Sequence, residues 1–567
     1  MIVNCSGPSN SGTIESGRDI LMTTCGELLV QLLEAYGVEL VFGIPGVHTV
    51  ELYRGLPKTQ IRHVTPRHEQ GAGFMADGYA RVSGKPGVCF IVTGPGMTNI
   101  LTAMGQAYAD SVPMLVISSV NRTEQLGMGD GRLHELPSQS RVVAGVSAFS
   151  HTLLRAEQLP QVMARAFAIF ASARPRPVHI EIPIDVIALP ADPALVAVRS
   201  IPLRPGPRPS DVERAAHLLM SSKTPLFILG GGAADAAEAA KCLAEDVDAP
   251  VINTVNAKGI LPPGHPLHAG ENMAFEPIRR AIATADVVLA AGTEFGETEM
   301  YPEPKPLQFN GKLIRIDIDA EQLVRGISAE VPIASDARLA LEAIRSAFIA
   351  LKGVGQRSAR ATHGVGATRA AAIRIATAKL WWPEIALHHK IARIVLENLP
   401  DAILVGDQTE PVYALNQCFE APRPRSYFNC STGYGTLGFA LPAGIGAKLA
   451  APSRPVVVMV GDGGLQFSIA ELASAVEAET PLVLLLWNNQ GYGEIKSYML
   501  ERKITSIGVD IFTPDFLTIA KGFGWYATRP GSFDELALEL QQAATRKGPT
   551  FIELKADVPF LKSGAAA

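Results

Sequence analysis

The sequence predicts an α/β protein built from three doubly wound parallel-sheet domains. Its 567 residues exceed what one hydrophobic core normally holds, and the length favours about three domains. Short apolar strands alternate with glycine-rich turns and helix-patterned segments, as they do in doubly wound sheets. The first and last parts of the chain share this alternation, which indicates two related units flanking a middle one.

Composition narrows the class of protein. Hydrophobic residues make up 47% and charged residues 19% of the chain, which is typical of a compact protein with much buried surface. A net charge of −5 gives no reason to expect nucleic acid or a membrane surface as a partner. No apolar run reaches the length of a membrane span, and the six cysteines are scattered without a CxxC pair. We therefore expect a cytoplasmic protein with reduced thiols.

The first unit is expected at residues 23–190, after a disordered leader at 1–22. Thr24 and Glu27 fit a capping box that starts a helix with leucines at helical spacing. Strands are predicted at 38–42, 61–65, 87–93 and 113–118. Residues 191–209 contain proline and arginine and predict a linker.

The second unit is expected at 210–350, with strands at 226–229, 251–254, 287–291 and 313–318. Three glycines, Gly230 to Gly232, follow its first strand. They suggest a dinucleotide only weakly, because the full fingerprint spacing is missing. Residues 351–382 lose apolar periodicity and become basic and rich in alanine and glycine, which predicts a second linker.

The third unit is expected at 383–567, and it contains the most informative stretch of the chain. A strand at 456–460 runs into Asp462-Gly463-Gly464, a helix-patterned segment follows, and a second strand at 481–487 leads to Asn489. Parallel strands joined by one helix end at the same edge of a sheet, where such folds bind ligands. The glycines would let the backbone approach a diphosphate, and the side-chain oxygens suit Mg²⁺. The alternative is an ordinary βαβ unit with glycine turns.

Glu69 is the second candidate for chemistry. It follows an apolar strand and precedes a helix dense in glycine and alanine, so we expect its carboxyl group to be largely buried. Burial raises the pKa of a carboxyl group, which would keep it protonated or sharing a proton with a ring nitrogen. The alternative is a carboxylate that caps the helix.

Four motifs in order carry a family resemblance: RHEQGAGFMADGYAR, VTGPGMTN, GYGTLGFALPAGIGA and GDGG…WNNQGYGEIK. They resemble the thiamine diphosphate-dependent 2-oxo acid enzymes, closest in layout to acetolactate synthases and benzoylformate decarboxylases, from Thr23 to about Val558. The resemblance implies pyrimidine-binding, central and diphosphate-binding domains, with thiamine diphosphate and Mg²⁺ as cofactors. It also implies a homodimer or homotetramer with active sites at the subunit interface.

In that family a glutamate at the position of Glu69 hydrogen-bonds the cofactor's aminopyrimidine and promotes loss of the thiazolium C2 proton. The resemblance makes Asp462, Asn489 and the Gly491 carbonyl the metal ligands. Gly463 and the adjoining Gly464 would meet the diphosphate.

The remaining cofactor contacts are expected at Gln408 and in the GYGTLGFALP motif. Gly435 would offer its carbonyl to the aminopyrimidine, and Leu437 would hold the cofactor in its bent conformer. Taken alone, Leu437 could equally be a core leucine.

Pocket residues are expected at Val47, His48 and His134. The resemblance makes His48 the natural proton donor or acceptor, although a histidine here could instead cap the next helix. His134 lies where acetolactate synthases tend to carry glutamine, which argues against carboligation.

Glu494 falls on the segment that faces the substrate side chain, where acetolactate synthases carry a large apolar residue. A carboxylate there suits a substrate with a cationic end, and a guanidinium would form a bidentate pair. The alternative is an ion pair with Lys496 or Arg502 on a helix face. Asp407 and Glu410 are further candidates for the contact with the cation.

The predicted function is decarboxylation of a 2-oxo acid, and the whole-chain pattern most resembles the 5-guanidino-2-oxopentanoate (2-ketoarginine) decarboxylases of arginine catabolism. The products would be 4-guanidinobutanal and CO₂. The alternatives are an acetolactate synthase-type carboligase acting on pyruvate and a non-catalytic binding or regulatory homologue. FAD, which acetolactate synthases bind, is not expected, because the segment GTEFGETEM after 287–291 is acidic and lacks arginine.

Overall fold

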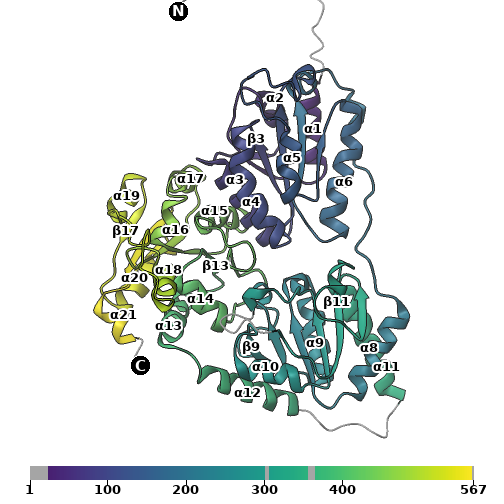
Figure 1. The fold of residues 1–567 in the computed structure, drawn as a ribbon, viewed down its shortest axis with the longest axis vertical. Helices are drawn as coiled ribbons and strands as arrows, with labels where there is room; N and C mark the ends of the chain where they lie inside the picture. The colour runs from purple at the N-terminus through teal and green to yellow at the C-terminus, as the bar shows by residue number, and fades with distance from the viewer. Residues whose placement is uncertain (1–22, 300–305, 355–363, 565–567) are drawn as a thin grey trace, which may run out of the picture.

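The computed structural model describes residues 23–299, 306–354 and 364–564. They form three lobes, each built on its own six-stranded parallel sheet flanked by helices (Figure 1). The predicted α/β class with three doubly wound parallel-sheet domains is confirmed. The leader predicted at 1–22 lies outside the described residues. No helix within the described ranges is long and apolar enough to cross a membrane.

The first sheet has the strand order β2-β1-β3-β4-β6-β5. Its strands are β1 (Leu40–Gly43), β2 (Arg62–Val64), β3 (Gly87–Ile91), β4 (Met114–Val120), β5 (Phe149–Thr152) and β6 (Val178–Pro183). Its helices are α1 (Cys25–Ala35), α2 (Val50–Gly55), α3 (Glu69–Ser83), α4 (Pro95–Ala109), α5 (Gln139–Val143), α6 (Leu159–Ser172) and α7 (Ile184–Ile187). The predicted capping box is confirmed: the Glu27 amide donates to Thr24 Oγ1 at 3.2 Å, and the Thr24 amide donates to the Glu27 carboxylate at 2.8 Å.

The second sheet has the order β12-β11-β10-β7-β8-β9. Its strands are β7 (Pro225–Leu229), β8 (Val251–Asn253), β9 (His268–Glu271), β10 (Val287–Ala291), β11 (Lys312–Asp317) and β12 (Val331–Ala334). Its helices are α8 (Pro209–Ser221), α9 (Ala237–Val247), α10 (Glu276–Thr284), α11 (Ala337–Val354) and α12 (Val365–Ala378). Helix α12 lies inside the stretch predicted as a linker at 351–382. It buries Ala370 against this lobe, and its alanines are strong helix formers.

The third sheet, β14-β13-β15-β16-β18-β17, repeats the order of the first. Its strands are β13 (Ile403–Gly406), β14 (Tyr427–Asn429), β15 (Val456–Gly461), β16 (Val483–Asn488), β17 (Tyr526–Thr528) and β18 (Thr550–Lys555). Its helices are α13 (Pro383–Asn398), α14 (Glu410–Cys418), α15 (Ala440–Ala450), α16 (Asp462–Gln466), α17 (Glu471–Glu477), α18 (Gly493–Glu501), α19 (Phe516–Gly522), α20 (Phe533–Ala543) and α21 (Pro559–Gly564). The expectation of one helix between the two strands of the 456–487 stretch is wrong. Two short helices, α16 and α17, form the connection, and Glu471 at the start of α17 contacts the first lobe at Arg67.

The first and third lobes share one buried apolar cluster, which runs from α3 and α4 into α15. Helices α3 and α15 pack antiparallel, with Met75 against Gly446 and Gly78 against Ala443. A Cβ atom on either glycine would collide with the backbone of the facing helix, so glycine permits this close packing. The two lobes therefore lie in direct contact along these helices (Figure 1).

Candidate active site

The carboxyl ends of β15 and β16 bring the three predicted metal ligands together. The side-chain amide of Asn489 lies 3.1 Å from Asp462 Oδ1 and 2.9 Å from the carbonyl oxygen of Gly491. The Asn489 amide can take two orientations. In one, its nitrogen donates to the Asp462 and Gly491 oxygens. In the other, its oxygen faces the same two oxygens, so that all three could bind one cation. Within the described residues there is no group of three or more His, Cys, Asp or Glu side chains that could hold a metal. A metal here would depend on ligands from a bound anion, and a diphosphate fits that requirement.

The turn that carries Asp462 is tightly packed. Asp462 is fully buried, and burial raises the pKa of its carboxyl group, so a cation would favour the ionised form. A Cβ atom on Gly463 would lie 2.6 Å from the ring of Tyr492, and one on Gly464 would lie 3.0 Å from Asp407 Oδ1. Only glycine keeps the backbone of this turn where a diphosphate could approach it.

The GYGTLGFALP loop lies beside this turn. Gly435 has φ +77°, and a Cβ atom on it would be 3.2 Å from Gln408 Nε2, so the structure brings these two predicted cofactor residues together. Gly438, with φ +79°, packs against Phe467 just after α16. Leu437 is partly buried rather than enclosed in the core. The loop and the turn thus form one continuous surface.

The Asp407 side chain fixes the backbone of this loop. Its fully buried carboxylate accepts hydrogen bonds from the amides of Gln408 at 2.9 Å, Gly438 at 3.2 Å and Ala440 at 2.9 Å. Burial raises the pKa of Asp407 to about 6, against the opposing effect of these amides. The expectation that Asp407 could contact a cationic substrate is not supported, because its oxygens are enclosed by backbone. Glu410 Oε1 accepts a hydrogen bond from His388 Nε2 at 2.8 Å.

Glu69 lies at the carboxyl edge of the first sheet, at the start of α3. The helix cap is His68, whose Nδ1 accepts from the Gln70 amide at 3.1 Å, so capping does not account for Glu69. Asn99 Nδ2 donates to Glu69 Oε2 at 2.9 Å. Asn99 is a site residue that the sequence did not single out, although it ends the VTGPGMTN motif. Contrary to expectation, Glu69 is only half-buried, because the edge of the sheet it occupies is open in a single chain.

His48 and His134 face each other at the same edge. Their rings meet edge to face with centroids 5.1 Å apart, and neither Nδ1 has a hydrogen-bond partner within the described part of the chain. Burial and the neighbouring His134 lower the pKa of His48. Helix α2 is capped at Thr49, so His48 is not its cap residue. Val47, beside the pair, is 68% exposed.

Glu494 is an exposed residue in the first turn of α18, five residues after Asn489. A Cβ atom on the preceding Gly493 would lie 2.5 Å from Asn489 Nδ2. The two cations considered as alternative partners of Glu494 also have contacts of their own. Lys496 pairs with Asp510 at 2.6 Å, and the guanidinium of Arg502 lies 3.5 Å from the ring centre of Tyr498.

The Glu69 half-site and the Asp462 half-site come from different lobes. Glu69 begins α3 of the first lobe, whereas Asp462 begins α16 of the third. Helix α3 also contacts the GYGTLGFALP loop of its own chain: the ring centre of Phe439 in that loop lies 5.3 Å from the Phe74 ring centre and 5.7 Å from the Arg81 guanidinium.

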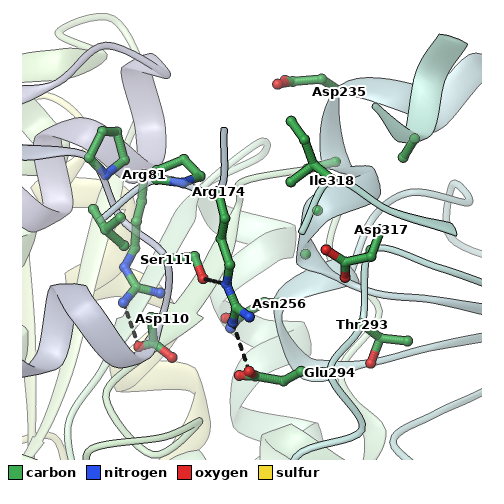
Figure 2. A pocket seen from close by; sticks show the side chains of 18 of the residues that line it. Arg81, Asp110, Ser111, Arg174, Asp235, Asn256, Thr293, Glu294, Asp317 and Ile318 are labelled. Atoms are coloured by element: carbon green, nitrogen blue, oxygen red, sulfur yellow. Dashed lines mark hydrogen bonds and ion pairs between the residues drawn. The ribbon is translucent and has the colours of Figure 1, made fainter. Parts of the chain in front are cut away.

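A separate cavity of about 300 Å³ lies where the three lobes meet (Figure 2). Arg174 crosses it, donating to Ser111 at 2.8 Å and to Glu294 at 2.7 Å. The glycine turn after β7 and Asp317 at the end of β11 line its second-lobe wall, and burial raises the pKa of Asp317. None of the predicted thiamine diphosphate contacts lines this cavity.

Comparison with known proteins gives matches to family models in all three lobes. Residues 23–142 match the thiamine pyrophosphate enzyme N-terminal TPP binding domain, residues 212–344 the central domain, and residues 408–554 the C-terminal TPP binding domain. Together these matches cover most of the described chain.

Curated relatives match over nearly the full length. The "Probable 2-ketoarginine decarboxylase AruI" of Pseudomonas aeruginosa is 49% identical over 535 residues, 94% of this chain and 94% of that protein. The acetolactate synthase isozyme 1 large subunit of Escherichia coli is 31% identical over 98% of this chain and 99% of its own. A probable acetolactate synthase large subunit of Methanocaldococcus jannaschii is 29% identical over 94% of this chain and 91% of its own.

Proposed function

The chain belongs to the thiamine pyrophosphate enzymes, and we propose that it decarboxylates a 2-oxo acid, using thiamine diphosphate and Mg²⁺ held between two copies of the chain. The observation that carries the proposal is the convergence of Asp462, Asn489 and Gly491 beside the glycine turn. Its second support is the intact Glu69–Asn99 pair, which a non-catalytic homologue would have no reason to keep.

Each half-site has a distinct task in this proposal. When bound, thiamine diphosphate supplies the carbon nucleophile and the electron sink for decarboxylation. Asp462, Asn489 and Gly491 would hold the metal, while Gln408, Gly435 and Leu437 fix the cofactor's position.

On the opposite half-site Glu69, oriented by Asn99, holds a proton at the ring nitrogen of the cofactor. In this proposal His48 gives or takes a proton at the substrate, and its lowered pKa keeps it neutral near pH 7. His134 packs against His48 and limits how its ring turns.

Exposed apolar side chains support assembly of two copies around the shared site. Around Glu69 and His48 these residues are Val47, Val50, Met128 and Leu133. Around Asp462 they are Phe467, Ile495, Tyr498, Leu500, Ile504, Ile507 and Phe512. Apolar surface of this extent is typical of a protein interface, and covering it would also bury Glu69.

The favoured substrate is 2-ketoarginine, converted to 4-guanidinobutanal and CO₂ in arginine catabolism in the cytoplasm. Its support is Glu494, a carboxylate near the proposed metal site that suits a guanidinium, and the relative described as a probable 2-ketoarginine decarboxylase.

The test of this proposal is to incubate the purified protein, thiamine diphosphate and Mg²⁺ with 2-ketoarginine, aromatic 2-oxo acids or pyruvate, and to identify the products. Acetolactate formed from pyruvate as the better reaction would overturn the decarboxylase proposal in favour of the carboligase. We also propose that the protein does not bind FAD. Yellow flavin bound to the purified protein would contradict this part of the proposal.

Replacing Glu494 with Gln is expected to weaken the use of 2-ketoarginine and to spare uncharged 2-oxo acids. Losing a charged hydrogen bond costs about 1.5–3 kcal/mol, so kcat/KM should fall by about ten- to a hundredfold. Steady-state kinetics with both substrate types measure this change. Glu501→Gln, at the far end of the same helix, is the matched control. Equal kinetics for Glu494→Gln and the native protein would return Glu494 to the role of a surface residue.

Replacing His48 with Gln is expected to lower kcat by about 10²-fold, because a general acid–base group is lost. Since burial lowers the pKa of His48, its protonation should limit native activity only below the usual histidine value of 6.5, with activity falling as the pH drops. The variant should lose this acidic limb, which a pH profile of kcat/KM would reveal. His151→Gln, on β5 of the same sheet, is the control. A variant that kept the native profile would remove His48 from the reaction.

A further inference from the structure

We propose that Glu471, on α17 of the third lobe, is the residue that positions Glu69 on the first lobe of the same chain. The role assigned to Glu69 rests on the proposed function, whereas the contact itself does not. Glu471 is only 1% exposed, although it is a charged residue in the first turn of a short helix. A carboxylate buried this deeply needs hydrogen-bond donors, and the first lobe supplies them.

The donors are the two backbone amides just before Glu69. The Arg67 amide lies 3.0 Å from Glu471 Oε1 and 3.1 Å from Oε2, and the His68 amide lies 3.1 Å from Oε1. From its own lobe, Ser474 Oγ donates to Oε2 at 2.6 Å, which fixes the carboxylate from behind. Both amides precede the hydrogen-bonded part of α3, so Glu471 satisfies groups that the helix itself leaves without a partner.

The first turn of α3 is shaped to admit this carboxylate. A Cβ atom on Gly71 would lie 2.7 Å from Glu471 Cδ, closer than real Cβ contacts, so any larger residue would displace the side chain. This accounts for a glycine two residues after Glu69. Glu471 thus binds the backbone just before Glu69 and packs against Gly71 just after it, while Asn99 holds the Glu69 carboxylate.

The contact between Glu471 and the first lobe differs from a surface ion pair between lobes. The same helix also carries Glu477, which pairs with the Arg67 side chain at the surface and accepts no hydrogen bond from a backbone amide of the described residues. A surface ion pair of that kind contributes little to stability. Glu471 instead fixes the backbone from which Glu69 projects, and a small displacement of a proton-transfer group is costly for catalysis. Glu477 therefore provides a matched control on the same helix and against the same partner residue.

The first test is amide hydrogen–deuterium exchange in the full-length, cofactor-free protein. In Glu471→Ala, peptides containing the amides of residues 67 and 68 should exchange at least about tenfold faster, because each loses its acceptor. Glu477→Ala should exchange like the native protein. Glu471→Gln retains an acceptor at Oε1 and should restore most of the protection. Unchanged exchange in Glu471→Ala would overturn the proposal.

Gly71→Ala should remove the same hydrogen bonds in a second way. Alanine favours the helix, but its Cβ atom would displace the Glu471 carboxylate. It should also speed exchange at residues 67 and 68, and adding it to Glu471→Ala should have little further effect. This variant decides the question if Glu471→Ala does not fold.

The second test uses the loaded enzyme. Glu471→Ala and Gly71→Ala should each lower kcat at least about tenfold, with KM for the 2-oxo acid within about twofold, because positioning of Glu69 affects proton transfer rather than substrate binding. Fast exchange at residues 67 and 68 with undiminished kcat would overturn the positioning role. A native protein without decarboxylase activity would instead overturn the proposed function and leave the exchange result standing.

Discussion

Glu69→Gln is expected to lower turnover by about 10²–10⁴-fold, the range that a positioned proton-transfer group contributes. The glutamine keeps the size of the side chain and a contact with Asn99, but it cannot carry the exchangeable proton. Binding of thiamine diphosphate should remain measurable, because the proposed metal ligands lie on the other half-site. Steady-state kcat at saturating cofactor and calorimetric binding of the cofactor separate the two effects.

Glu51→Gln is the matched control for this change. Glu51 lies on α2 of the same lobe and pairs with Arg54 at the surface at 2.7 Å, so its loss should leave kcat unchanged. Full activity of Glu69→Gln would overturn the assignment of Glu69 to the reaction.

Asp462→Asn is expected to produce the second large effect, on cofactor binding rather than on turnover of the loaded enzyme. It removes the carboxylate of the Asp462, Asn489 and Gly491 cluster. A lost charged contact of about 3 kcal/mol corresponds to about 100-fold weaker binding of the Mg²⁺-cofactor pair. Calorimetric titration with thiamine diphosphate at fixed Mg²⁺ measures this loss, and raising the Mg²⁺ concentration should restore part of the affinity.

Asp510→Asn is the control for Asp462→Asn. Asp510 pairs with Lys496 on the same lobe and is largely exposed, so cofactor affinity should not change. Native affinity in Asp462→Asn would mean that the metal lies elsewhere, and the proposed site would have to be abandoned.

Combining the two variants tests whether the site is shared between chains. At a thiamine diphosphate concentration too low to load Asp462→Asn, each variant alone should be nearly inactive, but a mixed dimer would contain one intact site, with Glu69 from one chain and Asp462 from the other. Co-expression of the two variants should therefore recover activity that neither shows alone. No recovery from isolated mixed dimers would place both half-sites in one chain.

Much of the cofactor site could be predicted from the sequence because the relevant signals are local. Asp462 and Asn489 each follow an apolar run, and in a parallel sheet such runs end at the same edge, so their proximity follows from topology. The capping box at Thr24 and the glycines around Asp462 likewise express constraints within a few residues. The three domains follow from the alternation of strands and helices.

The sequence by itself therefore determined the family, the three parallel sheets and the residues of the proposed metal site. Only the tertiary structure decided that Asp407 holds a loop, that His48 faces His134, and that Glu471 supports the backbone beside Glu69. It also showed that α3, which begins at Glu69, packs against α15 of the same chain. Each of these facts depends on contacts between segments far apart in the chain, and hydrophobic periodicity reports which face of an element is buried, not which distant group it meets.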